Sequence, residues 1–135
     1  MNKMNLLLII AVAIYLFGCG KGLEVHITSL NNNSMLPCTT YVEGTITDPN
    51  AEVWIVVHPM STKDFYVGNT IGVREAGSPW KVLLFVGTCG DSIFVGQHFE
   101  IRAISNPKAN LYKEKTFRNW PESEAKSQVV EVIRQ

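Results

Sequence analysis

The amino-acid sequence predicts an all-β domain, an antiparallel β-sandwich of seven or eight short strands, with a small open β-barrel as the alternative. Apolar and polar residues alternate over several short segments, as in strands with one buried face. The longest apolar run after residue 22 is rich in β-branched and aromatic residues, which strands favour. Turn residues recur roughly every 8–14 positions, and no long helical pattern or internal repeat is present.

Three strands are expected in the first half of the chain. Residues 23–28 alternate between aliphatic and polar side chains, which predicts a half-buried strand. A loop rich in Asn follows at 29–37, and a second alternating strand at 39–47. Residues 52–58 are almost continuously apolar, which is typical of a central strand covered on both faces. We therefore expect Trp54 to be buried in the core.

The second half of the chain contains four more predicted strands, at 65–73, 80–86, 99–104 and 128–134. Gly68 and Asn69 interrupt the first of these. Residues 106–126 are expected to be irregular, apart from one helical turn at 121–126. In that turn Glu122 and Lys126 would pair four residues apart.

Two stretches resemble a known architecture. A tryptophan on the third strand, and the pairing of VWIVVHP (53–59) with a later FEIRAI (99–104), are similar to the immunoglobulin-like sandwich. The same stretches resemble small bacterial domains of this type that mostly lack an assigned activity. The cysteines depart from the antibody pattern, because Cys38 precedes the second strand and Cys89 lies in a turn before the sixth. A bridge between them would be peripheral.

The first nineteen residues predict an exported, lipid-anchored chain. Lys3 precedes a twelve-residue apolar run, which is too short to span a bilayer and is typical of a secretory signal. Leu16-Phe17-Gly18-Cys19 resembles the lipobox of bacterial lipoproteins, although Phe17 is an unusual choice. The resemblance implies removal of residues 1–18 and lipidation of the Cys19 thiol. The alternative is an ordinary signal peptide, or a short membrane helix, with an incidental cysteine.

The expected mature chain has a lipidated tether at 19–22 and a single domain at 23–135. It would lie in the cell envelope outside the cytoplasm, anchored to the membrane by lipid. By resemblance, Gly20 in the second mature position allows delivery to an outer membrane if the host has one. The whole chain has 12 basic and 12 acidic residues, so that without Lys3 the mature chain has 11 and 12. This balance argues against a nucleic-acid partner.

Cys38 and Cys89 are the candidates for a disulfide. Beyond the inner membrane disulfides form and persist, and a bridge here would close a loop of about 50 residues. Neither cysteine belongs to a CxxC pair, so zinc and redox motifs lack support. Two free cysteines are the alternative.

The sequence offers no established catalytic motif. It contains no GxSxG, HExxH, P-loop or SxxK pattern, so we predict neither an enzyme nor a cofactor. His58, Asp64 and His98 would make a metal site only if loops brought them together, and no local spacing supports one. We therefore predict no metal, and expect His58 to make hydrogen bonds at the end of its strand.

The function expected first is a non-catalytic envelope domain for protein–protein interaction or assembly. The alternative is a carbohydrate- or cell-wall-binding module, in which Trp80, Trp120 and Tyr112 would stack on a polysaccharide. A competing interpretation places Trp80 in the core and Trp120 over an open end of the sandwich. A small envelope enzyme is a distant third.

Overall fold

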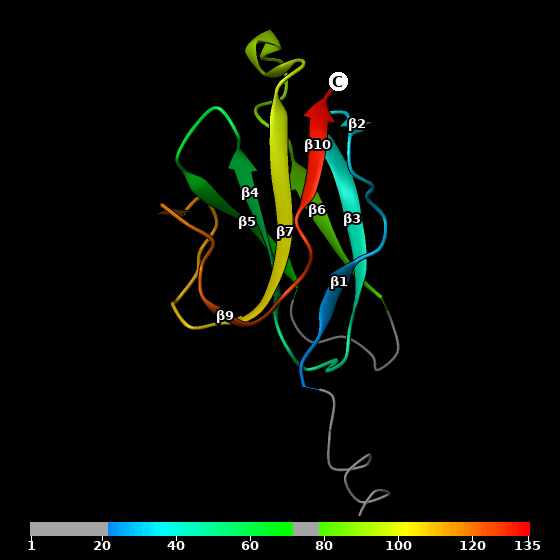
Figure 1. The fold of residues 1–135 in the computed structure, drawn as a ribbon, viewed down its shortest axis with the longest axis vertical. Coiled ribbons are helices and arrows are strands. Elements are labelled where there is room, and N and C mark those ends of the chain that lie inside the picture. Colours follow the sequence, from blue (N-terminus) through cyan, green and yellow to red (C-terminus); the bar gives the residue numbers. More distant parts are fainter. Residues whose placement is uncertain (1–21, 72–78) are drawn as a thin grey trace, which may run out of the picture.

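The computed structural model describes residues 22–71 and 79–135, which form two facing sheets (Figure 1). The predicted signal peptide, Cys19 and the end of the fourth predicted strand lie outside these ranges. No helix in the two ranges is long and apolar enough to cross a membrane. The strands are β1 (Val25–Ile27), β2 (Ser34–Leu36), β3 (Thr39–Ile46), β4 (Val53–Pro59), β5 (Phe65–Ile71), β6 (Trp80–Phe85), β7 (His98–Pro107), β8 (Thr116–Phe117), β9 (Ser123–Lys126) and β10 (Val130–Arg134), with a 3₁₀ turn η1 (Ser92–Phe94).

The sheets have different widths. The narrow sheet has three strands in the order β1-β3-β6, and the wide sheet follows the path β2-β10-β7-β4-β5-β8, with β9 paired to β7. Apart from the parallel pair β2–β10, the strand pairs are antiparallel. The sheets do not close into a barrel, so the predicted all-β sandwich is confirmed. Without β2, β8 and β9, the strand neighbours are those of an immunoglobulin-like sandwich.

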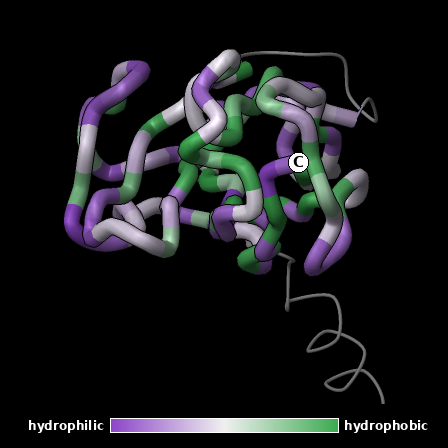
Figure 2. The backbone as a smooth tube through the Cα atoms, turned by 90° about the horizontal axis from the view of Figure 1, so that it is seen from above, coloured by the Kyte–Doolittle hydropathy of each residue, from purple (hydrophilic) through white to green (hydrophobic). Residues whose placement is uncertain are grey.

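The core lies between the two sheets. Val53, Ile55 and Val57 of β4 are inward-facing, and Val42 of β3 and Leu84 of β6 join the same buried cluster. Each such side chain contributes about 1.5–3 kcal/mol relative to an exposed one. Seen from above, hydrophobic segments gather toward the middle of the domain and hydrophilic loops lie around it (Figure 2).

Trp80, and not Trp54, is the core tryptophan. Trp54 is half-buried on the outer face of the wide sheet, because alternation along β4 turns Val53 and Ile55 inward. Its indole N–H donates to the Glu52 carboxylate at 3.1 Å. Trp80 is fully buried and donates from Nε1 to the Thr45 carbonyl at 3.0 Å, which satisfies its single polar group. The expectation of a buried Trp54 is therefore wrong.

The region predicted to be irregular contains two strands. The expected helical turn at 121–126 is wrong, since β9 pairs there with an extended β7 that runs to Pro107. Glu122 lies 3.9 Å from Lys108 in an exposed ion pair instead of pairing with Lys126. The short strand β2 also falls in a predicted loop, so the described ranges contain ten strands where seven or eight were expected.

The predicted disulfide is present. Cys38 and Cys89 are bonded, with their Cα atoms 5.2 Å apart. Cys38 precedes β3 and Cys89 follows β6, and next to the bridge the Val86 N–H donates to the Cys38 carbonyl at 2.9 Å. The bridge therefore joins the ends of two neighbouring strands of one sheet and is peripheral, as expected.

Gly44 provides a sensitive test of the core. A Cβ atom at this position would overlap the Trp80 indole and the His26 carbonyl. We expect Gly44→Ala to lower the free energy of unfolding by about 3 kcal/mol or more, as overpacking at a rigid site does. Urea denaturation would measure the change. Gly22→Ala is the control, because a Cβ there meets nothing within 4 Å, and an equal loss in both variants would contradict the packing described.

Removal of the disulfide should destabilise the domain without changing its fold. The bridge spans 51 residues, and we expect the double variant Cys38→Ser, Cys89→Ser to lose about 2–4 kcal/mol of stability. Thermal unfolding followed by circular dichroism would show a lower midpoint and an unchanged β spectrum at 20 °C. An unchanged midpoint would show that the bridge does not constrain the unfolded chain.

Candidate functional site

The three aromatic residues predicted to bind sugar lie in different environments. Trp80 is fully buried and presents no ring face to a ligand. Trp120 is half-buried on the outer side of the wide sheet. Tyr112 is 63% exposed, with the Lys115 ammonium 5.3 Å from its ring centroid. No ring contact between any two of them is seen in the described ranges, and the predicted platform therefore loses Trp80.

Trp120 belongs to a cluster around His58. The His58 ring stacks on Phe65 at a centroid distance of 4.0 Å, and Trp120 meets Phe65 edge-on at 4.7 Å. His58 Nδ1 lies 2.7 Å from Glu100 Oε1, and Nε2 lies 2.9 Å from the Thr62 carbonyl. Both ring nitrogens are thus hydrogen-bonded, as expected for a histidine at a strand end.

Arg102 completes this cluster. Its guanidinium carbon lies 5.4 Å from the Trp120 ring centroid, and its Nε donates to the Ser127 carbonyl at 2.7 Å. Burial lowers the pKa of Arg102, and the nearby Glu100 carboxylate partly offsets this. Arg102 and Trp120 together cover the outer face of the wide sheet.

The residues considered for a metal site are engaged separately. His98 Nδ1 lies 3.3 Å from Glu131, and Asp64 lies 3.6 Å from the Arg118 guanidinium. Within the described ranges, no group of three or more His, Cys, Asp or Glu side chains is placed to hold a metal ion.

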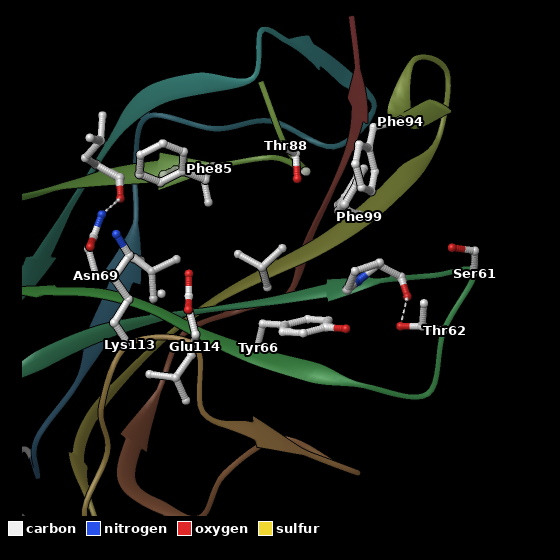
Figure 3. Close-up of a pocket in the computed structure, with 18 residues that line it drawn as sticks. Ser61, Thr62, Tyr66, Asn69, Phe85, Thr88, Phe94, Phe99, Lys113 and Glu114 are labelled. Atoms are coloured by element: carbon white, nitrogen blue, oxygen red, sulfur yellow. Dashed lines mark hydrogen bonds between the residues drawn. The ribbon is translucent and has the colours of Figure 1, made fainter. Parts of the chain in front are cut away.

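An apolar groove with a volume of about 630 Å³ lies between β5 and β6 (Figure 3). It forms where the wide sheet extends past the edge of the narrow one. Core residues of both sheets form its floor. They are Ile55, Val57, Leu84 and Phe99.

Polar groups line the mouth of the groove. The Asn69 amide donates from Nδ2 to the Leu83 carbonyl at 2.8 Å, across the gap between β5 and β6 (Figure 3). Lys113 lies with its ammonium 5.1 Å from the Phe85 ring centroid. Glu114 follows it, held because its N–H donates to the Val67 carbonyl at 2.7 Å. The mouth therefore combines one amide, one cation and one carboxylate around an apolar floor.

Exposed apolar side chains are concentrated around this groove. In the described ranges eight large hydrophobic residues are exposed. Two of them, Tyr66 and Phe85, line the groove. Four more are next in sequence to a lining residue, namely Met60, Ile93, Val95 and Tyr112. Exposed apolar side chains therefore occur both in the groove and in the segments that bound it.

The described lining of the groove includes no His, Cys or Asp side chain. The Ser61 hydroxyl donates to Gln97 and the Thr62 hydroxyl to the Pro59 carbonyl. Comparisons of this chain with protein-family models, curated proteins and solved structures find no match.

The groove was not predicted from the sequence, in which residues 80–86 are expected only to form a strand and Lys113 lies in a segment expected to be irregular. One signal in the sequence could have indicated the groove. Both faces of β6 carry apolar side chains, although only one face of this strand could be buried. The opening itself depends on the unequal sheet widths, which no local pattern encodes.

The His58–Glu100 contact should contribute measurably to stability. The two side chains are 15% and 30% exposed, so solvent screens the pair only partly. A double-mutant cycle with His58→Ala and Glu100→Ala should give a coupling energy of about 1–2 kcal/mol in urea denaturation. The exposed pair His98–Glu131 is the matched control. A coupling no larger than that of the control would contradict the geometry described.

Proposed function

We propose that this chain is a lipid-anchored, non-catalytic domain of the cell envelope that mediates protein–protein interaction or assembly through the groove between β5 and β6. The observation that carries the proposal is the concentration of exposed apolar residues around a groove of about 630 Å³. Proteins recognise such surfaces by inserting apolar side chains, and solitary domains seldom expose them.

The lipid anchor rests on the lipobox-like Leu16-Phe17-Gly18-Cys19. Acylation would confine the domain to a membrane surface and raise its concentration near other envelope proteins. Only Gly20 and Lys21 separate Cys19 from Gly22, where the described chain begins. A tether of that length reaches about 10 Å, so the end of the sandwich that bears the start of β1 would lie close to the membrane.

A carbohydrate- or cell-wall-binding module is the alternative. Trp120 and Tyr112 retain exposed ring surface, but they lie in different clusters and Trp80 is buried. Sugar-binding sites need ring faces with polar groups around them, and the groove floor is aliphatic as much as aromatic. Protein interaction is therefore the better-supported function.

The anchor is tested by metabolic labelling. We expect radiolabelled palmitate to be incorporated into the full chain expressed in a bacterial host, and Cys19→Ala to abolish incorporation. Labelling that persists in Cys19→Ala, or no labelling of the wild type, would contradict the lipoprotein assignment.

The interaction surface is tested by photo-cross-linking in living cells. A photoreactive amino acid in place of Phe85, on the groove, should give a discrete heavier species with another protein. The same amino acid in place of Lys126, an exposed residue of β9 away from the groove lining, is the matched control. Equal patterns at both positions, or none at Phe85, would contradict the groove as the interaction surface.

A further inference from the structure

We propose that the open edge of β6 and the adjoining groove bind an extended segment of another envelope protein as an added β-strand. The inference rests on the proposed function as an interaction domain, and it names the form of the partner. In this mode main-chain hydrogen bonds supply affinity, and pockets for alternate side chains supply specificity.

The first support is the hydrogen-bonding state of β6. Within residues 22–71 and 79–135 it is an edge strand, because the narrow sheet there has the order β1-β3-β6. The Leu83 carbonyl accepts a bond from Asn69 of β5, so Leu83 directs its backbone groups away from β3. Backbone groups alternate in direction along a strand. The backbone groups of Lys81 and Phe85 therefore also face the open side, at the spacing that an added strand needs.

Asn69 supports the same inference. Its side-chain amide carries the same N–H donor as a peptide group, and it occupies the place where an incoming strand would donate to Leu83. The bond spans the gap between the two sheets with a single side chain (Figure 3). An added strand could displace it and make several such bonds along β6.

The groove determines which side chains the added strand carries. Alternate residues of a strand on the β6 edge would point between the sheets, onto the apolar floor. The residues between them would face the outer side of the narrow sheet. There Lys81 lies 4.5 Å from the Tyr41 ring centroid, and Lys113 lies over Phe85. Two carboxylates balance these two ammonium groups, since Glu43 lies 4.0 Å from Lys81 and Glu114 follows Lys113 at the mouth of the groove. We therefore infer a segment that alternates apolar with polar residues.

The tether argues for a different protein rather than a second copy of this chain. A symmetric pairing of two β6 edges is antiparallel, because a parallel one would set N–H groups opposite each other. It would turn the second copy upside down. The start of β1 and the C-terminus lie at opposite ends of the sandwich (Figure 1), separated by about 33 Å if the ten-residue β7 spans its length. The short tether at 19–22 cannot bring both copies to one membrane.

The test uses amide hydrogen exchange on the lipidated mature chain in detergent micelles. The probe is an end-blocked eight-residue peptide of alternating valine with glutamate or threonine, at millimolar concentration. We expect exchange of the Leu83 and Phe85 N–H groups to slow about tenfold or more. Exchange at Val82 and Leu84 should not change, since their N–H groups already face β3.

Two matched peptides distinguish strand pairing from apolar contact alone. Each is N-methylated at every second residue, one on the odd positions and one on the even. Only one edge of an added strand faces β6, so one peptide should lose protection of Leu83 and the other should retain it. The proposal would be overturned if neither methylated peptide lost protection of the Leu83 N–H group. It would also be overturned if the unmethylated probe protected no amide of β6.

Asn69→Ala gives a test within the protein. Because the amide no longer competes for the Leu83 carbonyl, we expect the probe to bind several-fold more tightly, with an unchanged circular dichroism spectrum. Equal or weaker binding would contradict displacement of Asn69. If Phe85 is cross-linked to another protein in cells but the peptide protects no amide of β6 in vitro, the added strand is overturned. The proposed function as an interaction domain would then still stand.

Discussion

The unequal width of the two sheets is the constraint on which the rest of the structure depends. A sheet of three strands cannot cover one that extends from β2 to β8. On the β5 side the inner face of the wide sheet therefore continues beyond its partner, and the same boundary leaves β6 with an open edge. The groove and the outward-facing backbone groups of β6 lie side by side because both result from the unequal width of the two sheets.

The wide sheet has a second covering on its outer face. Val56 and Ile104 are fully buried although they lie outside the main core cluster. Trp120 lies on this face, with the Arg102 guanidinium carbon 5.4 Å from its ring centroid, and β9 widens the sheet by pairing with β7. The apolar run in β4 thus follows from burial on both faces, a pattern more usual for strands covered by helices.

Patterns of apolar residues predicted the seven principal strands. Period-two alternation marks strands with one buried face, and a continuous apolar run marked β4, which is buried on both. The pattern fails where a polar strand pairs at a sheet margin, and β9, with the sequence Ser-Glu-Ala-Lys, shows this failure. Trp54 was misplaced because a continuous apolar run does not reveal which face is inward. The disulfide followed from compartment and cysteine count, whereas the groove depends on strands far apart in sequence.

The Cys38–Cys89 bridge bears on how such a chain is made. If the chain is exported as proposed, it crosses the inner membrane before its cysteines meet an oxidising compartment. The two cysteines are 51 residues apart, so oxidation ties the entry of β3 to the exit of β6 only after most of the domain has emerged. The chain that crosses the membrane would therefore be the reduced and less stable form, and the bridge would add its stability only where the domain works.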